Sequence, residues 1–216
     1  MRYRDRAHAG EVLAEALAGR RWVEPVVLAL PRGGVPVAAP VAAALHAVLD
    51  VLVVRKVGAP RRPELALGAI AEGSDHVVWG EAVGHRPPDL ASIEGTIAAE
   101  RAELARRTTA YRGDRSLPDL EGHDVVVVDD GLATGATAEA ALRRVAGRGA
   151  HRVVLAVPVG PPSTIERLQQ VADEVVCPNV RPDLGSVGQW YDDFGQTRDA
   201  EVVDLLAEAA ARATGS

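Results

Sequence analysis

Short apolar runs alternate along the chain with longer segments in which apolar and polar positions follow a helical period. The runs are four or five residues long and rich in valine, and they lie at residues 26–30, 51–54, 125–128, 153–157 and 174–177. A strand buried on both faces reads as such a run, because neither side of it meets water. We therefore predict an α/β fold with a mostly parallel central sheet and helices on both of its faces.

The helical period appears both before and between these runs. The predicted helices are residues 5–20, 35–46, 90–111, 137–148, 163–171 and 200–213. Residues 57–75 are rich in glycine and proline, so we predict a long mobile segment there in which 65–70 could add a short strand. A second break, Arg86-Pro87-Pro88, precedes the long polar helix. We find no internal repeat, and 216 residues predict a single domain, 1–216.

The net charge and the residue composition exclude several classes of partner and site. The chain has 24 Lys and Arg against 30 Asp and Glu, a net charge of −6, so it lacks the overall basic field of a nonspecific nucleic-acid binder. The net charge does not exclude a local cationic patch. The single cysteine, Cys177, excludes an internal disulfide and a cysteine zinc site, and the six histidines show no metal-ligand spacing. No apolar run reaches the ~18 residues that cross a bilayer, and the first ten residues carry no signal core, so we expect a cytoplasmic protein without membrane contact.

In an open parallel sheet, ligands bind at the carboxyl ends of the strands. The richest of these ends begins with two adjacent carboxylates, Asp129 and Asp130. A turn into a helix follows, built from Gly131, Ala133, Thr134, Gly135, Ala136 and Thr137. Small residues let backbone amides approach a ligand, and a helix N-terminus favours an anion, so the turn suits a phosphomonoester. Hydroxyls or a metal would satisfy the carboxylates, and a sugar phosphate meets both demands. The alternative is an acidic pair that only caps the helix, with threonine as N-cap.

Residues 125–137 resemble the PRPP-binding signature of type I phosphoribosyltransferases: four hydrophobic residues, two acidic residues and a Thr-Gly-x-Thr turn. The resemblance implies the type I fold, in which a small hood from the N- and C-terminal segments covers the site. It also implies that Asp129 and Asp130 bind the ribose hydroxyls and that Ala133 to Thr137 bind the 5-phosphate.

Two other strand ends match the family in order. Arg32, Gly33 and Gly34 look like its pyrophosphate loop, although a plain turn is the alternative. Arg55 and Lys56 resemble the basic pair that begins its catalytic loop; Lys56 is the only lysine of the chain, and its alternative role is a cation that reaches solvent. Three further residues of that loop, Arg61, Arg62 and Glu64, receive no role.

The resemblance implies an Mg²⁺-dependent enzyme that transfers the 5-phosphoribosyl group of PRPP to a nucleobase or related nitrogen acceptor and releases pyrophosphate. Arg32, Lys56, Asp129 and Asp130 would be catalytic, and the two aspartates would hold Mg²⁺ through water. The alternative is a noncatalytic module that senses PRPP or a nucleotide. A phosphatase would need an Asp-x-Asp arrangement, which Asp129-Asp130-Gly131 does not supply. Many relatives on this fold form dimers, so a homodimer is one possible state, and the sequence does not determine the oligomer.

The acceptor is not determined by these motifs. The stretches 30–34 and 55–60 look closest to stand-alone phosphoribosyltransferases without an established acceptor. Ala133 stands where hypoxanthine–guanine enzymes carry an acidic residue, which disfavours a 6-oxopurine. Trp190, Tyr191 and Phe194 could stack on a base as part of the hood, and core packing is equally open.

Overall fold

The computed structural model describes residues 1–59, 62–74, 76–80, 83 and 90–214. Within these residues the main sheet has five strands, all parallel, in the order β2-β1-β6-β7-β9. Their bounds are Val26–Ala29 for β1, Val48–Val51 for β2, Asp124–Val128 for β6, Arg152–Ala156 for β7 and Glu174–Val176 for β9. The predicted parallel sheet is confirmed.

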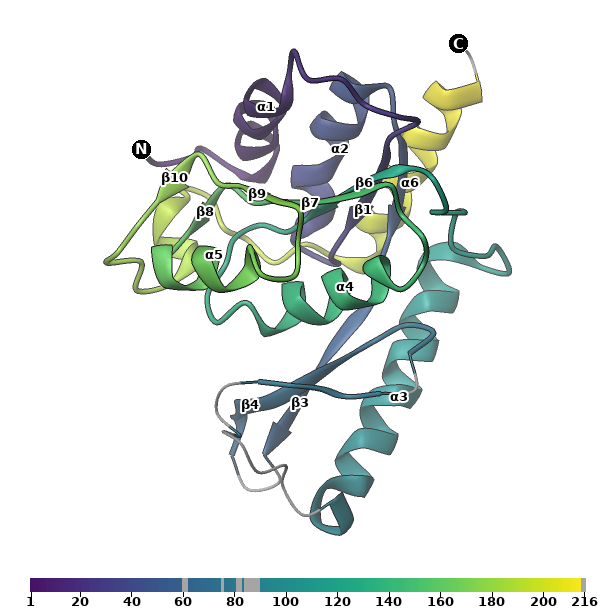
Figure 1. Cartoon of the computed structure of the whole chain (residues 1–216), viewed down its shortest axis with the longest axis vertical. Coiled ribbons are helices and arrows are strands. Elements are labelled where there is room, and N and C mark those ends of the chain that lie inside the picture. The colour runs from purple at the N-terminus through teal and green to yellow at the C-terminus, as the bar shows by residue number, and fades with distance from the viewer. Residues whose placement is uncertain (60–61, 75, 81–82, 84–89, 215–216) are drawn as a thin grey trace.

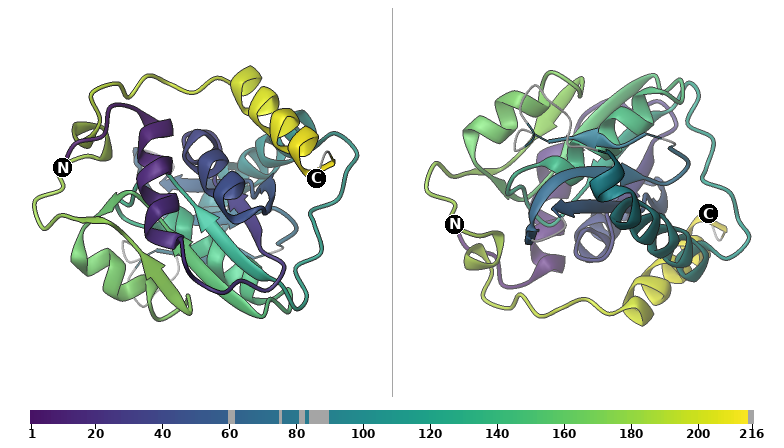
Figure 2. Two further views of the ribbon diagram at one scale, coloured as in Figure 1. Left: turned by 90° about the horizontal axis from the view of Figure 1, so that it is seen from above. Right: turned by 90° about the horizontal axis from the view of Figure 1, so that it is seen from below.

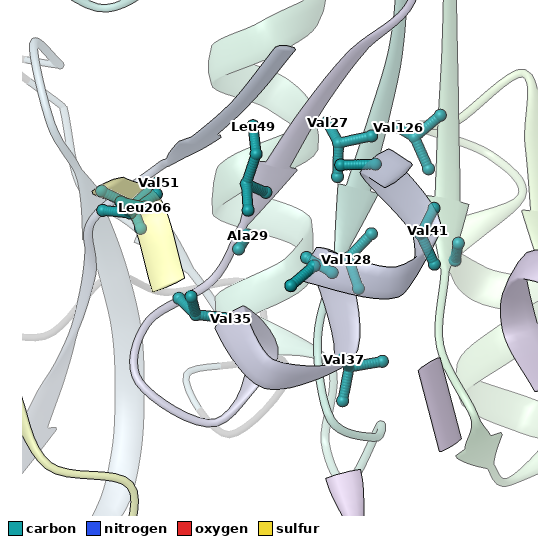
Figure 3. Close-up of a cluster of buried hydrophobic side chains, with 14 of the residues drawn as sticks. Val27, Ala29, Val35, Val37, Val41, Leu49, Val51, Val126, Val128 and Leu206 are labelled. Atoms are coloured by element: carbon teal, nitrogen blue, oxygen red, sulfur yellow. The ribbon is translucent and has the colours of Figure 1, made fainter. Parts of the chain in front are cut away.

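Helices cover both faces of this sheet, as predicted (Figure 1). On one face lie α1 (Arg6–Leu17), α2 (Gly34–Leu45) and α6 (Asp199–Thr214), and on the other lie α4 (Ala136–Ala146) and α5 (Pro162–Leu168). Side chains alternate between the two cores, because successive residues of a strand point to opposite faces. Val27 lies in the core beneath α2, which includes Val35, whereas Leu28 lies in the core beneath α4. Figure 3 shows the first of these cores.

The second predicted strand, residues 51–54, was wrong in its bounds. β2 ends at Val51, and Val54 begins β3 (Val54–Ala59), which belongs to another sheet. The residues from Val51 to Val54 are all buried, so hydrophobicity alone does not mark where one strand stops and the next begins. Arg55 and Lys56 therefore lie near the start of an antiparallel strand, and not at the carboxyl end of a core strand.

The strands β3, β4 (Arg62–Ala71) and β5 (Val78–Trp79) form a separate antiparallel sheet in the order β3-β4-β5. The strand expected at 65–70 is confirmed and is longer than predicted. The helix α3 (Leu90–Arg112) runs alongside this sheet, and together they project from the main body (Figure 1; Figure 2, right). The break at residues 86–88 lies outside the described residues.

The two terminal segments meet at one end of the main sheet. The backbone amide of Tyr3 donates to the carbonyl oxygen of Trp190 at 2.8 Å, and Tyr3 pairs with Tyr191 in an isolated bridge next to the 3₁₀ helix Val187–Trp190. A short parallel pair, β8 (Val159–Gly160) with β10 (Asn179–Val180), completes this region. We call residues 1–5 and 187–195 the hood. No helix in the described part of the chain is both long and apolar enough to cross a bilayer.

A buried charge network attaches α3 to the core. The guanidinium of Arg112 lies 3.2 Å from the carboxylate of Asp50 on β2 and 2.7 Å from that of Glu72, just after β4. It also donates to the carbonyl oxygen of Val51. All three charged side chains are buried, so the arginine satisfies two carboxylates that would otherwise be stranded away from water. This network holds the projecting sheet and helix in place beside the main sheet.

Replacing Arg112 by methionine should therefore destabilise the protein strongly. Removing one partner of a buried ion pair costs about 3–5 kcal/mol, because the remaining charges stay buried without compensation. Urea unfolding measures the loss. Arg106→Met on the same helix is the control, since its pair with Glu103 is exposed and should contribute little. Equal denaturation midpoints for Arg112→Met and the wild type would contradict this account of α3.

Candidate functional site

The three loops singled out in the sequence line one cavity of about 640 Å³. The candidate residues on its wall are Arg32, Gly33, Arg55, Lys56, Asp129, Asp130, Gly131, Ala133, Thr134, Gly135, Ala136 and Thr137. Gly34 is not on the wall: it is the first residue of α2, and its amide donates to the carbonyl oxygen of Leu30 at 3.0 Å. The structure thus brings together all but one of the predicted site residues.

The turn between β6 and α4 presents unused backbone amides. The amide of Leu132 donates to the carbonyl oxygen of Val159, whereas in the described part of the chain those of residues 133–137 donate to no protein acceptor. Gly135 is the N-cap of α4 in the left-handed conformation, with a φ of 73°, and no side chain caps the helix. The threonine-cap alternative is therefore wrong. Free amides at a helix N-terminus form a ready site for a phosphate group.

The acidic pair is held next to this turn. One carboxylate oxygen of Asp129 accepts a hydrogen bond from the amide of Asp130 at 2.9 Å, and Oδ2 of Asp130 lies 2.9 Å from Nε of Arg6. Burial raises the pKa of both carboxyls, and the charge of Asp130 raises the pKa of Asp129 further. The positive charges of Lys56 and Arg6 act in the opposite direction. The site thus holds two like charges together at a cost in free energy, which an incoming ligand can relieve.

Two of the three predicted cations are paired within the protein. Nη1 of Arg32 lies 3.6 Å from Oδ1 of Asp199, and Nε of Arg55 lies 2.7 Å from Oε2 of Glu100. The Lys56 side chain is exposed on the cavity wall, and among the described residues no carboxylate lies within ion-pair distance of its ammonium. Its ammonium therefore remains available to an anionic ligand.

Sequence reasoning missed several residues around the cavity. Thr96, Glu100 and Arg107 reach its wall from α3, and Arg6 supports Asp130 from behind. The three α3 residues are spaced by four and seven, which places them on one face of the helix. That spacing is a signal the sequence contains, although only the folded chain shows that this face meets the cavity. Arg6 carries no such signal.

The aromatic residues near the C-terminus do not form a stacking surface on the cavity. Tyr191 is 2% exposed and packs with Tyr3, and Nε1 of Trp190 donates to the carbonyl oxygen of Leu184. Phe194 packs beneath Arg6. In the described part of the chain Val187 is the hood residue on the cavity wall. Arg61 and the side chains of Arg62 and Glu64 lie outside the described residues.

A sequence model of the phosphoribosyl transferase domain matches residues 5–191 of the chain. The chain belongs to the phosphoribosyltransferase family. Two relatives, from two strains of Mycobacterium tuberculosis, carry the provisional name phosphoribosyl transferase and are each 47% identical to it over 205 residues. The match covers 95% of this chain and 46% of each relative, so the chain spans about half the length of these curated relatives.

Two solved structures are similar in fold to this chain. The crystal structure of the Thermus thermophilus protein TT1426 is 50% identical, with a TM-score of 0.82 over 96% of this chain and 99% of that one. A structure of the Aquifex aeolicus protein AQ2163, at 17% identity and a TM-score of 0.50 over 81% of this chain and 74% of that one, is similar in fold. The expected phosphoribosyltransferase fold is thus confirmed, and the roles of the individual residues remain predictions.

The strained acidic pair of this phosphoribosyltransferase domain leads to a stability prediction. Because the pKa of Asp129 is raised in the folded state, the wild type loses stability as the pH rises from about 4 through that raised pKa. Asp129→Asn removes the charge and can still accept the amide of Asp130, so at pH 7 its melting temperature should be higher by about 2–4 °C, the shift that about 1 kcal/mol causes at this size.

The gain should disappear below pH 4, where both proteins carry a neutral group at this position. Calorimetric melting at pH 3.5 and pH 7 measures it. Asp130→Asn is the matched comparison. It leaves Arg6 without its carboxylate partner, so its melting temperature should rise less than that of Asp129→Asn. A lower melting temperature for Asp129→Asn at pH 7 would show that the carboxylate is stabilised where it lies.

Proposed function

We propose that this domain is an Mg²⁺-dependent phosphoribosyltransferase that transfers the 5-phosphoribosyl group of PRPP to a nucleobase or related nitrogen acceptor and releases pyrophosphate. The observation that carries the proposal is one cavity that combines a turn of free amides with a partly buried acidic pair and a lysine without an ion-pair contact among the described residues. Each group suits a different part of the same phosphorylated sugar.

The acidic pair and the turn would bind the sugar phosphate. Asp129 and Asp130 would accept hydrogen bonds from the two ribose hydroxyls, which are donors that a buried carboxylate needs. The amides of residues 133–137, with the hydroxyls of Thr134 and Thr137, would bind the 5-phosphate. Diol and phosphate lie at opposite ends of the sugar, so binding both would fix its orientation.

The site offers two carboxylates to Mg²⁺, which is fewer ligands than the ion needs from the protein alone. The described residues contain no group of three or more His, Cys, Asp or Glu able to hold a metal by themselves. The acidic pair offers two carboxylates, and Mg²⁺ commonly combines one or two of these with water and substrate phosphates. Asp129 and Asp130 would therefore hold the ion through water, where it would neutralise the pyrophosphate charge.

The chemistry would depend on charge placement and needs no protein nucleophile. As pyrophosphate leaves, the ribose becomes cation-like, and the two carboxylates beside it favour that charge. Lys56, Arg32 and the backbone at Gly33 would stabilise the departing pyrophosphate. Arg32 and Arg55 would exchange Asp199 and Glu100 for phosphate oxygens, so their charges would stay compensated before and after binding.

Loss of either carboxylate should weaken Mg·PRPP strongly. Hydrogen bonds to a charged group contribute about 1.5–3 kcal/mol, so Asp129→Asn and Asp130→Asn should each raise the Kd about tenfold to a hundredfold in isothermal titration. Asp192→Asn is the control, because this exposed carboxylate pairs with Arg2 away from the cavity. Since Asp129→Asn is expected to melt higher than the wild type, its weaker binding cannot be attributed to unfolding. Unchanged affinities would refute the ribose assignment.

Transfer itself is tested by pyrophosphate release from Mg·PRPP with purine, pyrimidine and simple amine acceptors. At least one acceptor should give release, and Lys56→Gln should slow it about a hundredfold with a smaller change in Kd, since the lysine acts on the departing charge. Mg·PRPP at about 100 times its Kd should also raise the melting temperature by about 5–10 °C. Stabilisation without release for any acceptor would favour the sensing module instead.

A further inference from the structure

Arg6 lies behind the acidic pair and outside the cavity wall. It is the first residue of α1, and its Nε donates to Oδ2 of Asp130 at 2.9 Å. The two side chains are 11% and 17% exposed, so the ion pair is largely shielded from water and interacts more strongly than a surface pair. Arg6 is absent from the residues that line the cavity, so it does not contact a ligand there directly, and its hydrogen-bonded contact with the site is the one to Asp130.

The hood fixes the orientation of Arg6. Nη1 of Arg6 donates to the carbonyl oxygen of Gly195 at 2.7 Å, and the guanidinium carbon of Arg6 lies 3.9 Å from the centre of the Phe194 ring. A planar guanidinium with two engaged nitrogens and one face on an aromatic ring has little freedom to turn. Arg6 therefore approaches Asp130 from one direction.

Asp130 is held on its backbone side as well. The hydroxyl of Tyr191 donates to the carbonyl oxygen of Asp130 at 2.6 Å, and the Tyr191 ring packs between Tyr3 and Phe194 at centroid distances of 5.5 and 4.9 Å. Residues from both ends of the chain thus contact this one aspartate. Its carbonyl and Oδ2 are engaged, and no other residue in the described part of the chain donates a hydrogen bond to its Oδ1.

The backbone of the candidate pyrophosphate loop packs against this ion pair. A Cβ atom at Gly33 would lie 2.0 Å from Oδ2 of Asp130 and 3.1 Å from Nε of Arg6. Glycine is therefore needed at position 33 because the Arg6–Asp130 pair packs directly on its backbone. The first helix, the acidic pair and the Gly33 loop form one contact group.

We propose that Arg6 is a positioning residue for ribose recognition, which holds the Asp130 carboxylate so that its free oxygen faces the sugar diol. The inference rests on the proposed function, because the diol belongs to PRPP. A carboxylate tied at one oxygen cannot rotate without losing that contact, so the pair presents the other oxygen in a set direction before the ligand arrives. The N-terminal helix thereby completes a site otherwise built at the strand ends.

A double-mutant cycle tests this role, with the Kd for Mg·PRPP measured by isothermal titration for the wild type, Arg6→Gln, Asp130→Asn and the double variant. Arg6→Gln should weaken binding about tenfold. In the Asp130→Asn background the same change should have an effect smaller than about twofold, because residues that act through one contact are not additive. Full additivity, or wild-type affinity for Arg6→Gln, would overturn the proposal.

The controls separate positioning from general damage. Arg4→Gln makes the same change two residues earlier, on an exposed side chain 3.7 Å from Glu11, and should bind Mg·PRPP like the wild type. Mg·pyrophosphate has no ribose, so Arg6→Gln should bind it like the wild type; an equal loss for both ligands would overturn the proposal. Arg6→Lys keeps the charge and should bind Mg·PRPP with an affinity between those of the wild type and Arg6→Gln.

Should Arg6→Gln not fold, the same cycle with Arg6→Lys decides, and an additive effect or none at all would overturn the proposal. Failure of the proposed function looks different, because the wild type and Arg4→Gln would then not bind Mg·PRPP at any concentration tested. A wild type that binds, together with an indifferent or additive Arg6 variant, would overturn the positioning role alone.

Discussion

Two adjacent carboxylates kept together with only partial access to water are the constraint on which the rest of the site depends. Asp129 and Asp130 follow β6 directly, so the strand sets their position, and burial raises the pKa of both. Such a pair persists only where neighbouring groups compensate it. Arg6 provides an ion pair, Lys56 provides a facing positive charge, and the amide of Asp130 donates to its neighbour. Much of the architecture around the cavity supports this arrangement.

Several unrelated features of the chain acquire a shared explanation from this constraint. Gly33 leaves room for the Arg6–Asp130 pair, Tyr191 fixes the Asp130 carbonyl, and Phe194 supports Arg6. The terminal segments therefore do more than cover the sheet. They set the direction in which one carboxylate of the candidate site points, and this links the integrity of the hood to recognition of a ligand.

A second buried charge group supports the opposite side of the cavity. Arg112 joins the end of α3 to Asp50 and Glu72, and α3 in turn places Glu100 beside Arg55.

Membership of the phosphoribosyltransferase family is shown by the domain match over residues 5–191. The β3-β4-β5 sheet with α3 is the part of this domain that gives the cavity its third wall. Its polar residues Thr96, Glu100 and Arg107 line the cavity on that side.

Much of the fold and the loops that line the candidate site could be predicted without coordinates. Buried parallel strands appear as continuous apolar runs, and the glycine-containing turn after Asp129 and Asp130 has few other uses, so both are local properties of the chain. The division between β2 and β3 could not be read, because Val51 to Val54 are uniformly apolar while belonging to different sheets. The aromatic residues were equally ambiguous, since a ring in a core and a ring on a ligand have the same composition.

The sequence by itself determined most of the core strands and helices, the family and the loops that line the candidate site, because each depends on residues that are neighbours in the chain. Tertiary structure alone decided which distant residues complete those loops. Arg6 and Asp130 are separated by 124 positions, and Arg112 and Asp50 by 62. Pairings of this kind arise from how helices pack on a sheet, and an isolated arginine in a chain with many arginines gives no local signal of the carboxylate it will meet.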